Sequence, residues 1–291
     1  MKRRRMTTQL RRLISRGCIA MPGAFNAATA RLIARAGFSA VYVSGAGICN
    51  ATAGVPDIGL LGLSEVATLA GYITAAVNIP ALVDADTGFG SGFNAGRTVR
   101  ELERAGLAGM HLEDQVFPKR CGHLVGKSIV SVDEMTERLR AAAAARTDPD
   151  FLIVARTDAR AHEGLDAAID RAHAYLKAGA DAIFPEALQT EAEFARFAKS
   201  VGAPLLANMT EFGKSPLLGV SRLGKLGFRM VIFPQTAFRV AMKAEESAMS
   251  ELFRRGSQRS LLPRMQTRRE LYELLDYDPS ATLWPPKDKR K

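Results

Sequence analysis

The sequence predicts an α/β fold, namely a (β/α)8 barrel of the triosephosphate isomerase type. Short apolar runs alternate with amphipathic stretches of roughly a dozen residues, and eight such repeats can be counted. The runs are apolar at consecutive positions, which is typical of parallel strands that are buried on both faces. A length of 291 residues also suits one such barrel. Eight repeats are the number that closes the sheet.

The eight strand candidates are the runs Ile19–Pro22, Ala40–Ser44, Ala81–Asp84, Gly109–Glu113, Leu152–Ala155, Ala182–Pro185, Pro204–Ala207 and Met230–Phe233. The helical patterns between and after them cover residues 25–36, 64–77, 93–105, 132–146, 164–177, 190–200, 216–226 and 236–254. Glycines at 37, 106 and 179 stand where a helix ends before the next strand. An open, doubly wound sheet alternates in the same way. However, no GxGxxG follows the first run, which weakens a dinucleotide-binding interpretation.

Two segments are expected: a barrel with a basic N-terminal segment over residues 1–255, and a helical extension with a tail over residues 256–291. Met265–Tyr277 has the pattern of one amphipathic helix. A helix outside a closed barrel must bury its apolar face elsewhere, which favours a partner subunit.

The composition is that of an ordinary globular protein, with 47% hydrophobic and 24% charged residues. Cys18, Cys49 and Cys121 are far apart, odd in number and without a CxxC pair. This argues against a disulfide framework or a structural zinc site and favours a reducing, cytoplasmic location. No apolar run approaches the ~18 residues that span a membrane, so we expect no membrane partner.

The net charge of +10 is concentrated at the start, where residues 1–56 contain nine lysines and arginines and no acid before Asp57. A solvated first helix is the favoured interpretation; an Arg-rich targeting peptide and a nucleic-acid-binding arm are the alternatives. Aromatic residues are not interleaved with the arginines, so we expect no nucleic-acid partner. Elsewhere the positive balance favours an anionic small-molecule substrate.

Polar side chains gather where the predicted strands end, which is where such barrels carry their chemistry. They are Tyr42, Ser44, Gly45, Asp84, Asp86, His111, Glu113, Asp114, Arg156, Asp158, Glu186, Asn208, Thr210, Glu211 and Arg239. So many acids would repel one another unless a cation lay among them. Carboxylates without paired histidines indicate Mg²⁺, or Mn²⁺, rather than zinc. Asp84 and Asp86 share one face of an extended segment, although Asp-x-Asp also forms ordinary turns.

A loop after the fourth predicted strand carries Lys119, Arg120, Cys121, Gly122 and His123. Neighbouring positive charges stabilise a thiolate, so Cys121 is predicted to exchange its proton readily. His123 would orient and tune the thiol, or it is structural. The alternative is a solvated basic loop with an incidental cysteine.

Eight motifs follow one another in a familiar order: SGA at 44–46, VDADTGFG at 83–90, HLEDQ at 111–115, KRCGH at 119–123, ARTDA at 155–159, FPEA at 184–187, NMTEFG at 208–213 and MQTRRELYE at 265–273. Together they resemble the isocitrate lyase and phosphoenolpyruvate mutase superfamily over about residues 17–277. KRCGH marks the lyases of that superfamily. FPEA favours the branch that cleaves 2-methylisocitrate.

The resemblance implies a Mg²⁺-dependent carbon–carbon lyase that converts 2-methylisocitrate to pyruvate and succinate in the 2-methylcitrate cycle of propionate catabolism. The alternative is a related lyase or decarboxylase for isocitrate, 2,3-dimethylmalate or oxaloacetate. Cys121 argues against pure decarboxylation, because a carbanion acid matters less there. The superfamily also implies a homotetramer with exchanged C-terminal helices.

The resemblance also implies a role for each site residue. Asp84 and Asp86 would hold Mg²⁺, and Glu113 and Asp114 would act through water. Cys121 would be the general acid, His123 its partner and Tyr42 the candidate base. The residues expected to bind substrate are Ser44, Gly45, Ala46, Cys121, Gly122, Arg156, Glu186, Asn208, Met209, Thr210, Arg239 and Arg268.

Three stretches depart from the pattern of the superfamily. Relatives often carry glycine or a bulky residue at the position of Ala46, and residues 48–55 and the basic N-terminus are unusual too. These departures are expected to affect substrate choice more than reaction type.

Overall fold

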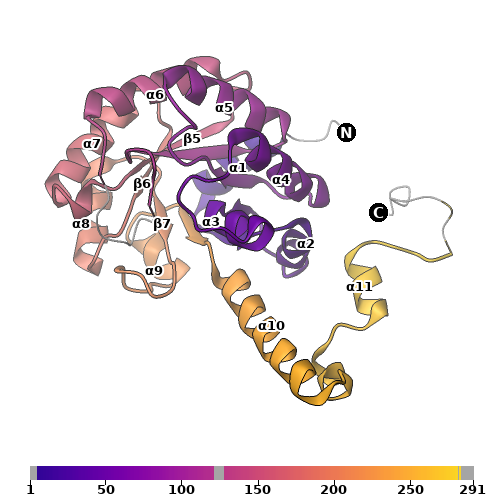
Figure 1. The fold of residues 1–291 in the computed structure, drawn as a ribbon. Coiled ribbons are helices and arrows are strands. Elements are labelled where there is room, and N and C mark those ends of the chain that lie inside the picture. Colours follow the sequence, from indigo (N-terminus) through magenta and orange to yellow (C-terminus); the bar gives the residue numbers. More distant parts are fainter. Residues whose placement is uncertain (1–4, 121–127, 281, 283–291) are drawn as a thin grey trace.

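Eight parallel strands form the centre of the molecule (Figure 1), in a computed structural model that describes residues 5–120, 128–280 and 282. The strands are β1 (Ile19–Ala24), β2 (Val41–Val43), β3 (Ala81–Asp84), β4 (Gly109–Glu113), β5 (Leu152–Thr157), β6 (Ala182–Pro185), β7 (Leu206–Asn208) and β8 (Met230–Phe233). They pair in the order β6-β5-β4-β3-β2-β1-β8-β7. A parallel bridge between Ile183 and Leu205 links β6 to the chain just before β7 and brings the sheet ends together. The predicted (β/α)8 barrel is confirmed.

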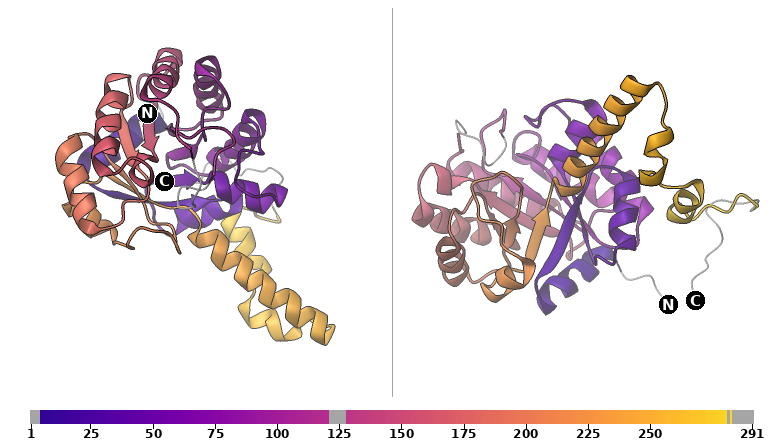
Figure 2. Two further views of the ribbon diagram at one scale, coloured as in Figure 1. Left: turned by 60° about the vertical axis from the view of Figure 1, so that its left-hand side comes forward. Right: turned by 90° about the horizontal axis from the view of Figure 1, so that it is seen from below.

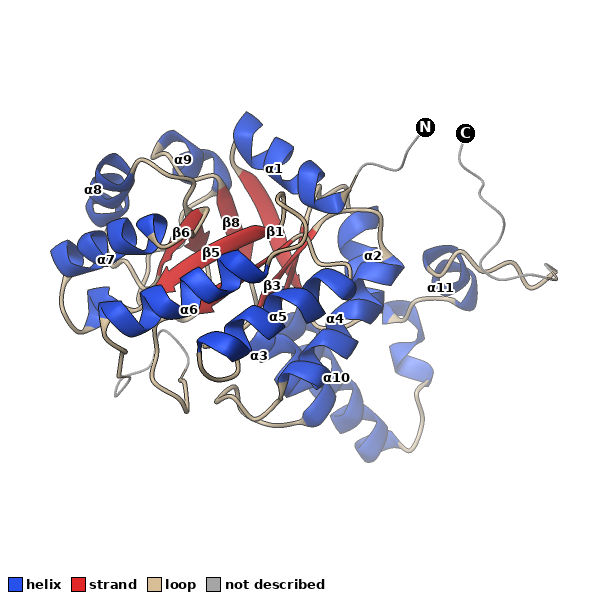
Figure 3. Cartoon of the chain, turned by 90° about the horizontal axis from the view of Figure 1, so that it is seen from above, coloured by secondary structure: helices blue, strands red, loops and turns tan. Residues whose placement is uncertain are grey.

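Helices lie around the outside of the strands (Figure 3). They are α1 (Met6–Arg16), α2 (Ala27–Arg35), α3 (Gly45–Ile48), α4 (Leu63–Ala76), α5 (Gly92–Arg104), α6 (Val132–Ala145), α7 (Leu165–Lys177), α8 (Glu191–Val201), α9 (Val220–Lys225), α10 (Thr236–Arg255) and α11 (Arg268–Leu274). A π-helix (Cys49–Ala53) continues α3, and 3-10 turns cover Ala159–Ala161 and Arg259–Arg264. Among the described helices, none has the length and apolar composition that crossing a bilayer needs.

The inside of the barrel is filled by a column of apolar side chains that begins at α1. Leu10 and Ile14 of α1 are buried against this column at the amino-terminal ends of the strands. At the other end the same column includes Tyr42, Phe184 and Ile232. A larger apolar cluster fills the space between strands and helices. The two ends of the barrel are therefore connected by packed side chains.

Polar contacts fasten α1 to the loop before β5. Thr7 donates a hydrogen bond to Asp148 at 2.9 Å. Arg11 donates to the carbonyl of Asp150 at 2.8 Å and lies 3.0 Å from the carboxylate of Asp181. The expectation of a solvated first helix is therefore wrong for one face of α1, because that face closes the bottom of the barrel.

The C-terminal part of the chain forms an arm that leaves the barrel along α10 (Figure 2). None of the residues of α10 is buried, and Phe253 is 94% exposed. The arm returns at α11, where Arg31 of α2 donates to the carbonyl of Leu274 at 3.1 Å and to Asp276 at 2.8 Å. The departure from the barrel surface thus begins within α10, while the expected division after residue 255 stays a prediction.

The helix expected over Met265–Tyr277 is shorter in the structure. Thr267 caps α11: its hydroxyl accepts from the amide of Glu270 at 3.2 Å, and the Glu270 carboxylate accepts from the Thr267 amide at 2.6 Å. This reciprocal cap fixes the start of the helix. Asp276 has φ of 52°, a left-handed conformation that ends it. Local capping therefore overrides the longer amphipathic pattern.

Candidate active site

A cavity of about 350 Å³ lies at the carboxyl ends of the strands. It collects nine of the residues that the sequence predicted for the site: Tyr42, Ser44, Ala46, Asp84, Arg156, Glu186, Asn208, Thr210 and Arg239. Its other lining residues are Asn50, Pro56, Asp57, Lys119, Arg120, Phe184, Ile232, Pro234, Gln235 and Phe238. Residues of six strands, namely β2, β3, β5, β6, β7 and β8, therefore converge on one cavity.

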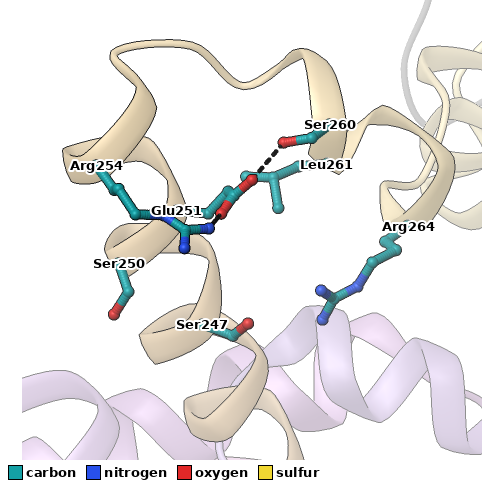
Figure 4. A pocket seen from close by; sticks show the side chains of 7 residues that line it. All are labelled: Ser247, Ser250, Glu251, Arg254, Ser260, Leu261 and Arg264. Carbon is teal, nitrogen blue, oxygen red and sulfur yellow. Dashed lines mark hydrogen bonds and ion pairs between the residues drawn. The ribbon is translucent and has the colours of Figure 1, made fainter.

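A second hollow of about 440 Å³ lies on the arm, between α10 and the turn at residues 259–264 (Figure 4). Glu251 is its centre: it pairs with Arg254 and accepts a hydrogen bond from Ser260 at 2.8 Å. Arg255 also lies 2.6 Å from Glu251. Among the described residues, the one acid that lines this hollow, Glu251, is already paired with arginines, and no residue of a strand lines it. The barrel cavity is therefore the candidate active site.

Asp84 ends β3 and faces the cavity. Its Oδ1 accepts a hydrogen bond from the amide of Asp86 at 3.0 Å, and its Oδ2 lies 3.5 Å from the hydroxyl of Tyr42. Burial alone would raise the pKa of this carboxyl, but the positive charges around it, with Lys119 and Arg156 among them, hold the pKa below its usual value. Asp84 is therefore an anion at neutral pH.

Asp86 lies two residues further on, with a left-handed φ of 47°. Left-handed conformations at non-glycine residues concentrate at functional sites. Its Oδ1 is 2.8 Å from the ammonium of Lys119. Burial raises the pKa of Asp86 to about 6, although Lys119 opposes the shift. Lys119 therefore holds the carboxylate of Asp86 beside the cavity, although Asp86 is not among the residues that line it.

Lys119 and Asp57 are site residues that the sequence analysis did not assign. Lys119 is 3% exposed and pairs with Asp57 as well as with Asp86. Two signals were available: Lys119 belongs to the KRCGH motif, and Asp57 is the first acid in a basic N-terminal region. Neither signal reveals that the two side chains meet, because they are 62 positions apart.

Arg156 is a cation in the wall of the cavity and is 8% exposed. Its guanidinium makes a two-point contact with Asp158, at 2.9 and 3.2 Å. It also lies 3.0 Å from Glu113 and stands over the ring of Phe184. Burial opposes its charge, but the acids around it raise the pKa of Arg156 well above the usual value. Arg156 is therefore a permanently charged group, held in a fixed plane.

Glu113 ends β4 and is 1% exposed. Neither of its carboxylate oxygens accepts a hydrogen bond from the described residues, although Arg156 lies 3.0 Å away. Burial raises the pKa of Glu113 well above its usual value. A buried carboxylate with free acceptor sites fits a neighbouring cation or bound water.

Tyr42 and His111 form a pair beneath the cavity, where the Tyr42 hydroxyl is 2.8 Å from Nε2 of His111. Burial, followed by the charge of Asp84, raises the pKa of Tyr42 well above its usual value. Burial also lowers the pKa of His111 to about 4, so the imidazole is neutral at pH 7. With this raised pKa, the Tyr42 hydroxyl is protonated at neutral pH in the free protein. The assignment of Tyr42 as the base stays a prediction.

The turn after β2 brings backbone close to Asp84. Ser44 caps α3 by accepting a hydrogen bond from the amide of Gly47 at 3.1 Å. A Cβ at Gly45 would stand 2.8 Å from Oδ2 of Asp84, so only glycine permits this approach. The predicted substrate-binding turn therefore lies directly against the predicted metal ligand.

Three predicted site residues point elsewhere in the structure. Met209 is 2% exposed, and its sulfur accepts from the amide of Leu218. Asp114 accepts from the amide of Asp158 and from the hydroxyl of Tyr175, both at 2.8 Å, outside the cavity. Arg268 opens α11 on the arm. The assigned roles of these residues stay predictions.

Cys121, Gly122 and His123 lie outside the described residues. Their roles as acid, substrate contact and partner of the thiol are predictions that rest on the motif alone.

The carboxylates near the cavity have some of the features that a hard divalent cation needs. Asp84, Asp86 and Glu113 supply only oxygen, are largely buried, and include acceptor atoms without a hydrogen bond among the described residues. Within the described ranges, however, no three His, Cys, Asp or Glu side chains already converge as a metal cluster. Mg²⁺ commonly uses one or two carboxylates and fills its other positions with water and substrate, so the residues suit Mg²⁺.

The fold and the site together define the class: a (β/α)8 enzyme that acts on a small carboxylate, with buried cations facing the strand ends. The chain belongs to the phosphoenolpyruvate phosphomutase family, whose model matches residues 10–253.

Relatives that carry the name 2-methylisocitrate lyase match most of the chain. The protein from Aeropyrum pernix is 51% identical over 92% of this chain and 86% of its own length. The protein from Escherichia coli K12 is 50% identical over 88% of this chain and 86% of its own length. Both matches extend over most of the barrel and site.

Solved structures agree with the fold. Oxaloacetate acetylhydrolase with 3,3-difluorooxalacetate has a TM-score of 0.89 at 34% identity, covering 94% of this chain and 93% of its own. 2,3-Dimethylmalate lyase has a TM-score of 0.88 at 35% identity, with coverages of 93% and 91%. Phosphonopyruvate hydrolase with oxalate and Mg²⁺ has a TM-score of 0.84 at 31% identity, with coverages of 93% and 95%.

Proposed function

We propose that this protein is a carbon–carbon lyase that cleaves 2-methylisocitrate to pyruvate and succinate. The observation that carries the proposal is the cavity wall, where the buried Arg156 guanidinium stands over the ring of Phe184, and where Ile232 and Pro234 add further apolar surface. A tricarboxylate with a methyl substituent needs both features. Relatives named for this reaction, about half identical in sequence, support the same substrate.

The apolar part of the wall suits the methyl group of the substrate. Phe184 and Ile232 are each 1% exposed, so their side chains are held by the packed barrel interior. A methyl group that packs against these side chains is removed from water. Isocitrate has a hydrogen in place of this methyl group, so the same space would stay unfilled. One methyl group contributes about 1–3 kcal/mol of discrimination, so the preference for 2-methylisocitrate over isocitrate should be clear but limited.

The proposed reaction is a retro-aldol type of cleavage. The 2-hydroxyl group loses its proton, its oxygen becomes the carbonyl of pyruvate, and the carbon–carbon bond breaks. The electron pair stays on the succinate carbon, which then takes a proton from the thiol of Cys121. Tyr42 is proposed to exchange the proton with the hydroxyl group. Glu186, Asn208, Thr210 and Arg239 would hold the succinate half, and Arg156 the carboxylate of the pyruvate half.

Asp84 and Asp86 are proposed to hold Mg²⁺, with Mn²⁺ as a substitute. When bound, the ion would supply Lewis-acid stabilisation of negative charge on the substrate oxygens. The carboxylate set described above supports this assignment. Titration calorimetry tests it directly: Mg²⁺ should bind the wild type and bind Asp86→Asn at least about tenfold more weakly, since a charged oxygen ligand is lost.

The protein is also proposed to be a homotetramer in which the C-terminal arms are exchanged. The support is the exposed apolar surface of α10, with Val240 at 66%, Met249 at 59% and Phe253 at 94% exposure. Surface of this kind marks a site of protein association. The place of Arg268 on the arm supports a role at the cavity of a second copy. The cytoplasmic location predicted from the unpaired cysteines belongs to the same proposal.

The deciding experiment compares 2-methylisocitrate and isocitrate with Mg²⁺ and with EDTA, and follows the release of pyruvate and glyoxylate. Pyruvate release should need Mg²⁺, exceed glyoxylate release, and disappear in Cys121→Ser. If neither substrate is cleaved, the lyase proposal fails. In that case 2,3-dimethylmalate and oxaloacetate are the next substrates, because two of the similar structures act on them by name.

A further inference from the structure

Gln115 occupies the point where the chain leaves β4 and where it returns before α6. It follows the acids Glu113 and Asp114 and is 1% exposed. Its backbone forms an antiparallel bridge with Ile129, and the amide of the next residue, Val116, donates to the carbonyl of Ser128 at 2.9 Å. The outgoing and returning segments are therefore fastened together at Gln115.

The side chain of Gln115 makes a second fastening, to the backbone of Arg120. Its Oε1 accepts from the amide of Arg120 at 2.8 Å, and its Nε2 donates to the carbonyl of the same residue at 2.9 Å. The reversed orientation of the carboxamide would put donor against donor and acceptor against acceptor. The two bonds therefore fix both the side chain of Gln115 and the peptide groups on either side of Arg120.

This clamp holds the backbone next to Lys119. The ammonium of Lys119 lies between Asp57 and Asp86, 2.8 Å from the latter, and the side chain is 3% exposed. Arg120 itself lines the cavity. A lysine side chain has four flexible bonds, so the place that its charge reaches depends on where its backbone is held. The two hydrogen bonds from Gln115 hold the backbone of Arg120, which is the next residue after Lys119.

We propose that Gln115 is a positioning residue of the lyase reaction, acting through Lys119. It holds the backbone of Arg120, and this keeps the Lys119 ammonium between the two carboxylates at the edge of the cavity. The inference rests on the proposed function only for its effect on catalysis; the position of Lys119 is a property of the free protein. A displacement of about 1 Å in a site of this kind lowers the rate by about 100-fold.

A purely structural role for Gln115 makes a different prediction. If Gln115 only joined the two segments, its loss would lower stability and would leave the environment of the Lys119 amine unchanged. The proposal instead requires that this amine becomes more accessible when the clamp is lost. The two interpretations therefore differ in a chemical property of one named amine.

The first test measures the acetylation rate of individual lysines by acetic anhydride and mass spectrometry, without substrate. Gln115→Met removes both bonds to Arg120 at similar volume, and Gln115→Glu keeps the size but loses the donor. In both variants Lys119 should react several-fold faster relative to Lys177, which is exposed. Gln189→Met is the matched control, because Gln189 is exposed and far from this loop in sequence. An unchanged Lys119 rate in the folded variants would overturn the proposal.

The second test is a double-mutant cycle of kcat/KM with Gln115→Met and Lys119→Met. Gln115→Met should lower kcat/KM about 10- to 100-fold in the wild type and have almost no further effect once Lys119 is gone, since coupled residues are not additive. Equal losses in both backgrounds would contradict the proposal. An inactive wild type would refute the lyase function alone, because the acetylation result needs no substrate.

Discussion

The ammonium of Lys119 lies 2.8 Å from Oδ1 of Asp86 in a place that is almost closed to solvent. The same ammonium pairs with Asp57, so one cation joins the loop after the π-helix to the end of β3. Breaking a buried pair is costly because a charge is left without a partner. This three-residue cluster is therefore sensitive to substitution.

Lys119→Met should lower stability by about 3 kcal/mol and reduce kcat/KM at least 100-fold, because Asp57 and Asp86 are left without their cation. Urea unfolding and steady-state kinetics measure the two effects. Lys177→Met, which changes an exposed lysine on α7, is the control and should alter neither. Wild-type activity in Lys119→Met would contradict the role of this ammonium.

Arg156→Lys should raise KM and lower kcat/KM by about two to four orders of magnitude, because an ammonium cannot replace a planar two-point contact. In the wild type the guanidinium makes that contact with Asp158, at 2.9 and 3.2 Å. Arg160→Lys makes a matched control: Arg160 forms a similar fork with Glu193, at 3.0 and 2.6 Å, and is not among the cavity residues. Equal decreases of kcat/KM in the two variants would show that the cavity position is irrelevant.

Tyr42→Phe should lower kcat strongly while the free energy of unfolding changes by about 1 kcal/mol, since one hydrogen bond to His111 is removed and the ring still packs. Tyr175→Phe is the control. Tyr175 is equally buried, donates to Asp114 at 2.8 Å and accepts from Arg171 at 3.0 Å, away from the cavity. Because two hydrogen bonds are lost there, Tyr175→Phe should lower stability at least as much as Tyr42→Phe, while activity is abolished only in Tyr42→Phe. Full activity of Tyr42→Phe would exclude it from the proton transfer.

Asp114 should make the stability of the metal-free protein depend on pH. Burial, followed by the charge of Asp158, raises the pKa of Asp114 from 3.8 to about 6. The folded state therefore binds the proton more tightly than the unfolded chain, and stability falls as the pH rises from about 4 to about 6. The fall amounts to roughly 2–3 kcal/mol. In Asp114→Asn, urea unfolding should show a flatter profile over this range; the same slope would refute the assignment.

Subunit mixing tests whether Arg268 acts on a second copy. Arg156→Ala and Arg268→Ala should each be nearly inactive. If arms are exchanged within pairs, random mixing of the two restores about one quarter of the wild-type sites, because half of the pairs are mixed and one of their two sites is intact. Arg268 acting on its own cavity would restore none. A mixture of Arg156→Ala with Arg156→Lys is the negative control.

The eight strands are predictable from the sequence because each is a short run buried on both faces. β3, β4, β6 and β8 have the predicted bounds. In each of them a charged residue, a proline or a turn comes directly after the apolar run. The strand ends are predictable for the same reason: Asp84 and Glu113 are the first acids after apolar residues. Parallel strands then bring them to one edge.

Contacts between loops are not visible in such patterns. Asp57 and Lys119 meet across 62 positions, and neither periodicity nor spacing encodes that meeting. The outward orientation of Asp114 is equally hidden, because the direction of a side chain at a strand end depends on the next backbone angle. A capping residue, Thr267, shortens a helix that the amphipathic pattern extends.

The contacts of α1 give this first helix a structural role in the barrel. Leu10 and Ile14 close the amino-terminal end of the apolar column inside the barrel, and the other end of this column, at Phe184 and Ile232, forms the floor of the cavity. A chain that is shortened to begin after Arg16 would lack these two side chains, and solvent would enter the barrel at the amino-terminal ends of the strands. The packing of Phe184 and Ile232, which face the substrate, would then be weakened at the end of the column away from the cavity. An enzyme of this design depends on its first helix even though that helix never approaches the reaction.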